Sequence, residues 1–187
     1  MTGDDVPRRG ATVHPARLPA EELLREVRIE TARGSGPGGQ HRNKTETAVR
    51  AIHLPTGIEA HASERRSLHI NKSQAVKRLR LKLAIEHRCP LPEDSFIPPG
   101  IFEPSPLWRS RLRERRIVAS VDHVDFPALL SEALDVLEHC GDDVSRAAGL
   151  LLTSTAQLVK FLDKEPLVLS RLNERRRKHG LKPFHTT

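Results

Sequence analysis

The chain of 187 residues is 37% hydrophobic and carries a formal net charge of +7. That apolar content suffices for a modest folded core, and no apolar run approaches the roughly 20 residues of a membrane-spanning helix. The N-terminus lacks an apolar signal segment and the two cysteines form no CxxC pair, so a secretory leader, a zinc site and a disulfide framework are not indicated. We expect a cytoplasmic monomer, without membrane association, whose positive charge faces a polyanion.

The positive charge is unevenly distributed along the chain. Residues 1–88 hold 17 Lys and Arg against 10 Asp and Glu, whereas residues 89–187 hold 14 of each kind. Within the second half, the basic stretches 109–116 and 171–182 flank the acidic segment 120–166. The first half is therefore expected to provide most of the contact with a polyanion.

The first half predicts a small α+β domain over residues 19–88. Residues 1–18 show no periodicity and are expected to be a flexible lead, after which PAEELLREV predicts a short helix. RIETARG predicts a strand that runs into a glycine-rich loop, and AVRAIHLPTGIEAHAS alternates around Pro-Thr-Gly as a β-hairpin does. Apolar residues at helical spacing then predict a basic helix from about Asn71 to His87, packed on the sheet.

The second half predicts a small all-α module behind a proline-rich linker. The segment 89–107 contains six prolines, which favour an extended connector. Residues 108–187 are expected to hold a basic segment, a helix between Asp125 and Gly141, two short helices around a turn, and a basic terminal helix that ends at Gly180. The fold class predicted for the whole chain is α+β.

The glycine-rich loop at residues 34–45 reads GSGPGGQHRNKT. A phosphate-binding P-loop requires a lysine where Gln40 stands, and a dinucleotide-binding fingerprint must open a helix, whereas a hairpin follows here. An ordinary surface turn would not require the donors and cations from His41 to Lys44. Glycines let the backbone approach a crowded centre and adopt φ > 0, which leaves the amide of Gln40 free to donate toward a reacting group.

The segment RGSGPGGQHRNKTETAVRAIHLPTGIEAHASERRSLHINKSQAVKRLRLKLA resembles the catalytic domain of class I peptide chain release factors and their ribosome-rescue relatives. The resemblance covers about residues 19–88 and lies in GPGGQ, NKT, AVR, PTGI, SERRS and the helix that follows. It implies that Gly38, Gly39 and Gln40 are the catalytic tip of a loop that enters the peptidyl transferase centre and promotes hydrolysis of the ester between peptide and tRNA. No metal or soluble cofactor is implied. The close spacing of metal ligands is also missing from the four histidines of this region, His41, His53, His61 and His69.

The partners implied by the resemblance are the ribosome, through large-subunit ribosomal RNA, and peptidyl-tRNA. Basic side chains in and around the domain are expected to bind phosphates, with an affinity that falls steeply with salt. In the rescue relatives a basic tail after this domain occupies the vacant mRNA channel, so the two basic stretches of the second half are added as candidates. The full set of expected RNA-binding residues is Arg33, His41, Arg42, Asn43, Lys44, Arg50, Arg65, Arg66, Lys72, Lys77, Arg78, Arg80, Arg111, Arg115, Arg175, Arg176, Arg177 and Lys178.

Full-length release factors carry a stop-codon-reading domain ahead of the GGQ domain, and only about 18 residues precede it here. The sequence therefore suggests codon-independent hydrolysis of peptidyl-tRNA on stalled ribosomes. An alternative is a non-catalytic RNA- or ribosome-binding module that the helix-turn-helix-like segment 141–162 directs to its target. In that segment Leu152 stands where a turn glycine is usual and Thr153 where an aliphatic residue is usual, which argues against DNA reading and favours a small helical bundle. The nine acidic residues of 120–166 argue against a general phosphate-binding surface there.

Overall fold

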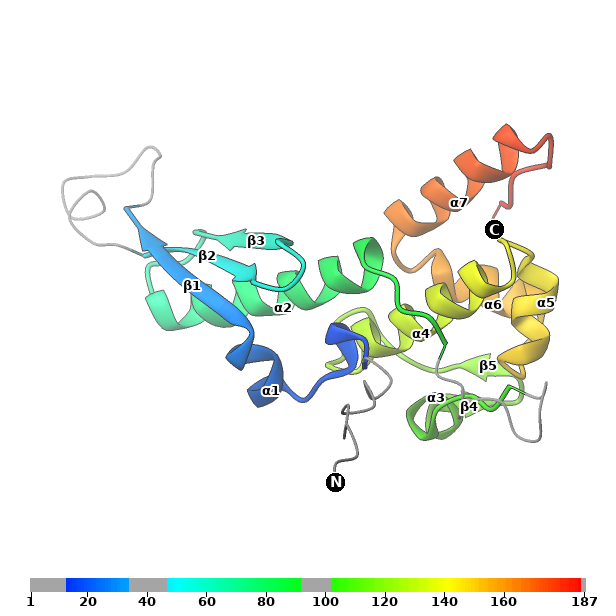
Figure 1. The fold of residues 1–187 in the computed structure, drawn as a ribbon, viewed down its shortest axis with the longest axis horizontal. Helices are drawn as coiled ribbons and strands as arrows, with labels where there is room; N and C mark the ends of the chain where they lie inside the picture. Colours follow the sequence, from blue (N-terminus) through cyan, green and yellow to red (C-terminus); the bar gives the residue numbers. More distant parts are fainter. Residues whose placement is uncertain (1–12, 34–46, 92–101, 186–187) are drawn as a thin grey trace, which may run out of the picture.

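The computed structural model describes residues 13–33, 47–91 and 102–185, and this part of the chain has the predicted α+β fold. Residues 13–91, the N-terminal module, contain a three-stranded sheet, and residues 102–185, the C-terminal module, are mostly helical (Figure 1). The elements are η1 (Pro15–Arg17), α1 (Ala20–Arg25), β1 (Val27–Ala32), β2 (Ala48–His53), β3 (Glu59–Ala62), α2 (Leu68–Glu86), α3 (Pro106–Arg111), β4 (Leu112–Arg113), β5 (Arg116–Ile117), α4 (Phe126–His139), α5 (Val144–Leu150), α6 (Thr155–Leu162) and α7 (Pro166–Lys178).

The sheet of the N-terminal module is antiparallel and has the order β1–β2–β3. The predicted hairpin between β2 and β3 is confirmed, and Gly57 in its turn has a φ of +70°, which glycine adopts without steric cost. The buried inner face of β2 and β3 pairs Val49 with Ala62 and Ala51 with Ala60. Because three of these four side chains are alanines, a helix can approach the sheet closely.

Helix α2 covers this inner face of the sheet. Ala75, Leu79 and Leu83 follow one another at helical spacing and are 0% exposed. The helix begins earlier than the sequence predicted, because the hydroxyl of Ser67 caps it by accepting a hydrogen bond from the backbone N–H of Ile70 at 3.4 Å. Its N-terminal end lies at the outer end of the sheet, and its C-terminal end points toward the C-terminal module (Figure 1).

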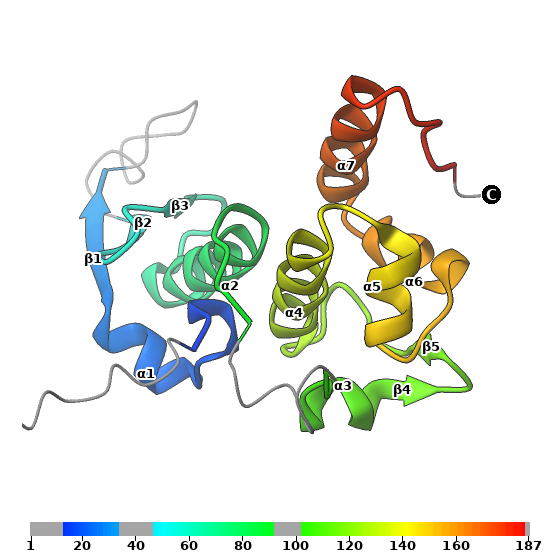
Figure 2. The ribbon, with the colours of Figure 1, turned by 45° about the vertical axis from the view of Figure 1, so that its right-hand side comes forward.

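The C-terminal module is built around helix α4. Every residue from Phe126 to Leu137 is buried, because α4 lies between α2 on one side and α5 on the other (Figure 2). The only tryptophan of the chain, Trp108, is fully buried and packs edge-to-face against Phe161, with ring centroids 5.7 Å apart. Its indole N–H donates to the carbonyl of Leu151 at 2.9 Å. The predicted helices at 126–139, 144–150, 155–162 and 166–178 are confirmed.

The two modules share one apolar core, and buried polar groups cross their junction. Arg17 of η1 donates to Asp135 of α4 at 2.6 Å and to the hydroxyl of Ser131 at 3.2 Å. The backbone N–H of Cys89 donates to the other carboxylate oxygen of Asp135 at 3.1 Å. Arg17, Cys89, Ser131 and Asp135 are called the junction cluster below. Their mutual bonds fix the end of α2 against α4.

The proline-rich segment enters regular structure earlier than the sequence predicted. Ser105 caps α3 by accepting a hydrogen bond from the N–H of Trp108, and Pro106 occupies the first turn, where its missing N–H leaves no bond unmade. Residues 92–101 lie outside the described part, so the linker and the domain boundaries remain predictions. No helix in the described part has the length and apolar content needed to cross a membrane.

Candidate functional site

The glycine-rich segment connects two paired strands. Strand β1 ends at Ala32, which pairs with Ala48 at the start of β2. Gln40 is equidistant in sequence from these two residues. The predicted catalytic residues Gly38, Gly39 and Gln40, and the predicted RNA-binding residues His41, Arg42, Asn43 and Lys44, lie outside the described residues. What the structure shows is the loop base, defined as Ala32, Arg33, Thr47 and Ala48, at the end of the sheet far from the C-terminal module (Figure 1).

A buried asparagine fixes one side of the loop base. Asn71 in the first turn of α2 is 0% exposed, and its side-chain N–H groups donate to the carbonyls of Thr47 at 2.6 Å and Arg65 at 2.7 Å. Its side-chain oxygen accepts from the N–H of Arg65 at 3.0 Å. Both amide hydrogens and the oxygen are therefore used, so the loop base is tied to the start of α2.

The sequence analysis did not name Asn71 as a site residue. The available signal was an uncharged polar side chain, in the first turn of a basic helix, at a position that the helical spacing directs toward the sheet. Its partners could not be identified, because Thr47 lies far away in sequence, beyond the β2–β3 hairpin.

Three predicted RNA-binding cations surround the start of α2. Arg65, Arg66 and Lys72 are exposed, and their charged groups have no hydrogen-bond or ion-pair partner among the described residues. Arg33, also exposed, follows the last residue of β1. The structure thus brings these four residues to the same end of the molecule as the loop base (Figure 1).

Other predicted cations of the N-terminal module are engaged in ion pairs. Arg50 binds Glu59 and Glu30, and Arg78 donates to Glu64 at 2.6 Å and to the carbonyl of His61 at 2.7 Å. The hydrogen bond from Arg50 lowers the pKa of Glu59, and that from Arg78 lowers the pKa of Glu64. These pairs are exposed and lie along the sheet and α2 rather than at the loop base.

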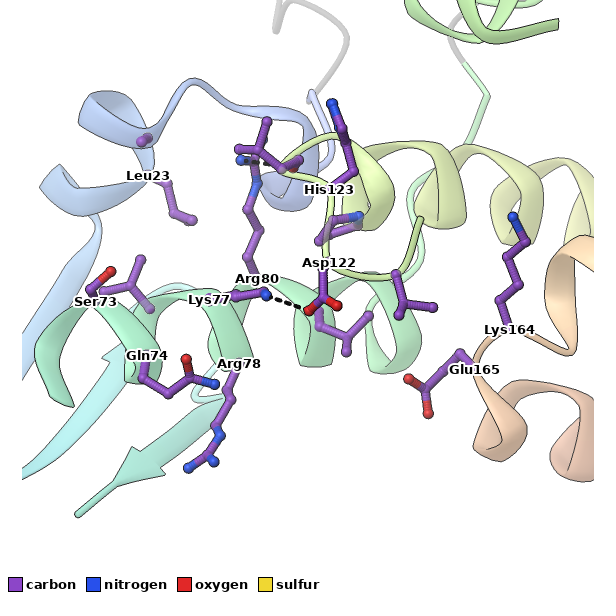
Figure 3. A pocket seen from close by; sticks show the side chains of 16 residues that line it. Leu23, Ser73, Gln74, Lys77, Arg78, Arg80, Asp122, His123, Lys164 and Glu165 are labelled. Atoms are coloured by element: carbon purple, nitrogen blue, oxygen red, sulfur yellow. Dashed lines mark hydrogen bonds and ion pairs between the residues drawn. The ribbon is translucent and has the colours of Figure 1, made fainter. Parts of the chain in front are cut away.

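A cavity of about 530 Å³ separates α2 from the segment that precedes α4 (Figure 3). Lys77 spans it to bind Asp122 at 2.9 Å, as Figure 3 shows. The Arg80 guanidinium is half-buried and donates to the carbonyls of Ala16 and Leu18, both at 2.9 Å. Burial lowers the pKa of Arg80. Both residues were predicted to bind RNA, and the structure places them at the junction of the modules, where they hold neighbouring elements.

The predicted basic stretches of the C-terminal module are also largely paired. In the first, Arg111 binds Asp125 at 2.5 Å, and Arg115 donates to the carbonyl of Thr153 at 3.0 Å. In the second, Arg175 binds Asp142 at 2.5 Å. Also in α7, the Arg176 guanidinium lies 4.0 Å from the Phe184 ring centroid, Lys178 binds Glu174 at 3.0 Å, and Arg177 is exposed without a side-chain partner among the described residues.

The described residues provide no metal site. No group of three or more His, Cys, Asp and Glu side chains within them could hold a metal ion. His53, one of the four histidines considered from the sequence, is 1% exposed and is bonded to Glu26 at 3.0 Å and to the Thr56 hydroxyl at 2.8 Å. It holds the β2–β3 turn against the end of α1.

Comparison with known proteins assigns the N-terminal module. Residues 22–92 match the family described as RF-1 domain. Peptide chain release factor 1 of Verminephrobacter eiseniae is 45% identical over 82 residues, which cover 44% of this chain and 20% of that protein. Peptide chain release factor 1 of Acetivibrio thermocellus is 51% identical over 79 residues, which cover 39% of this chain and 22% of that protein. Peptide chain release factor 2 of Buchnera aphidicola subsp. Baizongia pistaciae is 56% identical over 59 residues, which cover 32% of this chain and 16% of that protein.

The matched segment spans about a fifth of the length of these curated relatives. It contains the loop base, Asn71 and the cations Arg65, Arg66 and Lys72. Residues 22–92 are therefore an RF-1 domain, and this part of the chain is similar to peptide chain release factors.

Proposed function

We propose that this protein hydrolyses the ester of peptidyl-tRNA in the peptidyl transferase centre of the ribosome. Gly38, Gly39 and Gln40 form the catalytic tip, and no metal or cofactor takes part. The observation that carries the proposal is the GPGGQ sequence midway between two strands of an RF-1 domain, with Asn71 tying down the base of the connection.

The chemistry follows from one main-chain donor. Attack of water on the ester carbonyl creates an oxyanion, and the backbone N–H of Gln40 stabilises it. Loss of one such donor typically costs about 3 to 4 kcal/mol of transition-state stabilisation. The protein needs no nucleophile of its own, because water attacks the ester and the ribosome holds the substrate.

The loop base and its cations support this assignment. A chain of eight residues can reach at most about 28 Å, so Gln40 can enter a narrow site while the sheet remains outside it. Arg33, Arg65, Arg66 and Lys72 lie where the loop leaves the sheet, and they bind ribosomal RNA or tRNA phosphates beside the entrance. Arg50 and Arg78, which stay exposed although each is paired with a carboxylate, bind at the rim of this contact.

We further propose that hydrolysis does not depend on a stop codon, so that the protein rescues stalled ribosomes. The sequence suggests this part of the proposal, and the basic helix α7 is the candidate for the mRNA channel. The experiment compares release of labelled peptide from ribosomes stalled on a truncated mRNA with release from ribosomes that hold a stop codon in the A site. Release from the truncated complex supports rescue, and release only with a stop codon contradicts it.

The variants Gln40→Pro and Gln40→Ala test the catalytic role. Proline deletes the backbone N–H, whereas alanine keeps it, so Gln40→Pro is expected to lower the release rate constant by about 100- to 1,000-fold. Gln40→Ala is expected to retain a rate within about tenfold of the unmodified protein. Equal rates for the two variants would contradict the main-chain donor. Absence of peptide release with the unmodified protein would favour a protein that only binds the ribosome.

A further inference from the structure

The acidic segment of the C-terminal module directs most of its carboxylates toward other elements. Of the nine acidic residues of 120–166, six contact a cation or a hydroxyl group elsewhere in the fold. These pairs are Asp122 with Lys77, Asp125 with Arg111, Glu132 with Ser105, Asp135 with Arg17, Glu138 with Arg88 and Asp142 with Arg175. The acidic composition of the segment therefore does not make its whole surface negative.

Three cations of this module lie together beside α6. Arg116 of β5, Lys160 of α6 and Lys164 just after α6 line one surface pocket of about 380 Å³, together with the polar side chains of Ser120 and Gln157. All three cations are exposed. Among the described residues, no carboxylate lies within ion-pair distance of any of them.

The charges of these residues repel one another. Burial lowers the pKa of Lys164, and the positive charges of Arg116 and Lys160 lower it further. The Lys164 ammonium donates one hydrogen bond to the carbonyl of Ala119 at 2.5 Å and lies 6.0 Å from the centroid of the Phe161 ring, and it donates no other hydrogen bond to the described residues. An anion between the three cations would relieve this repulsion and accept the unused hydrogen bonds.

The hairpin before α4 holds Arg116 in place. Its two turn residues, Glu114 and Arg115, have φ angles of +47° and +64°, which non-glycine residues adopt only at a steric cost. Two hydrogen bonds fix this turn to the α5–α6 connection, since the Arg115 guanidinium donates to the carbonyl of Thr153 and the Thr153 hydroxyl donates to the carbonyl of Arg115. Arg115 is thus a positioning residue, and Arg116 projects from a rigid support beside α6.

We propose that Arg116, Lys160 and Lys164, called the cationic cluster below, bind phosphate groups of an RNA backbone. Charge, exposure and a supported position favour this ligand, and the choice of RNA over DNA rests on the proposed function. The cluster lies in the C-terminal module, at the opposite end of the molecule from the loop base (Figure 1). The protein therefore has two separate RNA contacts, one for catalysis and one for anchoring.

The test uses the full chain and a fluorescein-labelled RNA duplex of 20 base pairs, titrated over a series of salt concentrations. Arg116→Ala combined with Lys160→Ala is expected to weaken binding about tenfold and to reduce the slope of log affinity against log salt by about two, one for each lost phosphate contact. Neither side chain makes a hydrogen bond or ion pair among the described residues, so the variant is expected to fold. Fluorescence of Trp108 verifies that the module is intact.

Arg146→Ala is the matched control, because it removes one exposed cation from α5 of the same module. Its affinity and salt slope are expected to equal those of the unmodified protein. An unchanged affinity of the double variant, or an equal loss for Arg146→Ala, would overturn the proposal. Tighter binding to a DNA duplex of the same sequence through the same two residues would overturn the assignment to RNA.

The test separates this inference from the proposed function. Gln40→Pro is expected to bind the RNA duplex like the unmodified protein, because its defect is catalytic. Suppose that the unmodified protein is inactive in peptide release while Arg116→Ala with Lys160→Ala still loses duplex binding. The proposed function then fails and the RNA-binding cluster stands. If the unmodified protein releases peptide normally and the double variant binds the duplex as tightly as it does, the cluster alone is refuted.

Discussion

The cations around the start of α2 and those of the basic stretch 109–116 differ in whether they have partners. In the RF-1 domain, the cations nearest the loop base, Arg65, Arg66 and Lys72, are exposed and without side-chain partners among the described residues. In the C-terminal module, the stretch 109–116 holds five arginines and one glutamate, yet Arg111 and Arg115 are bonded internally. A basic run in a sequence is therefore a poor guide to a binding surface. What matters is whether each charge has a partner, and the partners here are remote in sequence.

Each module also contains a buried asparagine that holds a backbone segment in place. Asn71 holds the loop base in the RF-1 domain, and Asn173 of α7 holds the C-terminal end by donating to the carbonyl of Phe184 at 2.9 Å and accepting from its N–H at 2.7 Å. Both anchors are side-chain-to-backbone bonds made in a buried site. Only the first lies beside the segment to which we assign catalysis.

Among changes outside the glycine-rich loop, the largest effect is expected from Asn71→Ala. The change leaves two carbonyls and one N–H without partners, and it is expected to lower the free energy of unfolding by about 2 to 4 kcal/mol and the peptide-release rate constant by at least about tenfold. Urea unfolding and the peptide-release assay measure the two effects. Asn173→Ala is the control, with a smaller loss of stability and an unchanged rate constant for release. Equal effects of the two variants on release would remove the functional distinction between the anchors.

A smaller effect, on folding stability, is expected from lowering the pH, because two groups at the junction between the modules change their protonation. Burial lowers the pKa of His14 to about 3, while burial raises the pKa of Asp135 to about 6 although Arg17 opposes the shift. Below pH 6.5 the unfolded chain protonates His14 and the folded protein does not, so stability falls with pH. Below pH 6 the folded protein protonates Asp135 and the unfolded chain does not, so stability rises. The two contributions largely cancel between pH 7 and pH 4.5.

Asp135→Asn removes the contribution of Asp135 to the pH dependence of stability and leaves that of His14. The melting temperature of this variant is expected to fall more steeply between pH 7 and pH 4.5 than that of the unmodified protein. Thermal unfolding followed by circular dichroism at several pH values measures the slope. A shallower slope for Asp135→Asn would show that the junction cluster does not titrate as described.

The smallest effect is expected at Leu152, in the turn between α5 and α6. Its φ is +55° and it is 50% exposed, so the side chain loses little burial while the backbone is strained. Leu152→Gly is expected to raise the free energy of unfolding by about 0.5 to 1 kcal/mol, measured by urea unfolding with Trp108 fluorescence. Leu167→Gly, a change of a similarly exposed leucine in helix α7, is expected to lower it. A loss of stability in Leu152→Gly would mean that the leucine makes a contribution that outweighs the strain.

Much of the fold could be predicted from local patterns in the sequence. Apolar spacing identified α2 and the helices of the C-terminal module, and Pro-Thr-Gly identified the hairpin with Gly57 in its turn. The identity of Leu152 already indicated a departure from the usual glycine turn, and the structure shows that the backbone keeps the left-handed conformation there. Such features depend on neighbours within a few residues.

The unpredicted features depend on contacts between distant residues. Arg17 and Asp135 form an ion pair across the junction, and Asn71 donates a hydrogen bond to the carbonyl of Thr47. Arg80 donates to one carbonyl of η1 and to the carbonyl of the residue after η1. The cationic cluster combines a hairpin residue with two residues near the end of α6, so counting charges over 120–166 could not reveal it. Once the partners of each charge are known, the free cations at the two ends of the molecule become visible.

One measurement tests the division between catalysis and anchoring most directly. The rate constant of peptide release is determined in single turnovers, as a function of protein concentration, on ribosomes stalled on a truncated mRNA. Gln40→Pro is expected to lower the maximal rate constant about 100-fold or more with an unchanged half-saturating concentration, and Arg116→Ala with Lys160→Ala is expected to raise that concentration with an unchanged maximal rate constant. A maximal rate constant for Gln40→Pro equal to that of the unmodified protein would contradict the account.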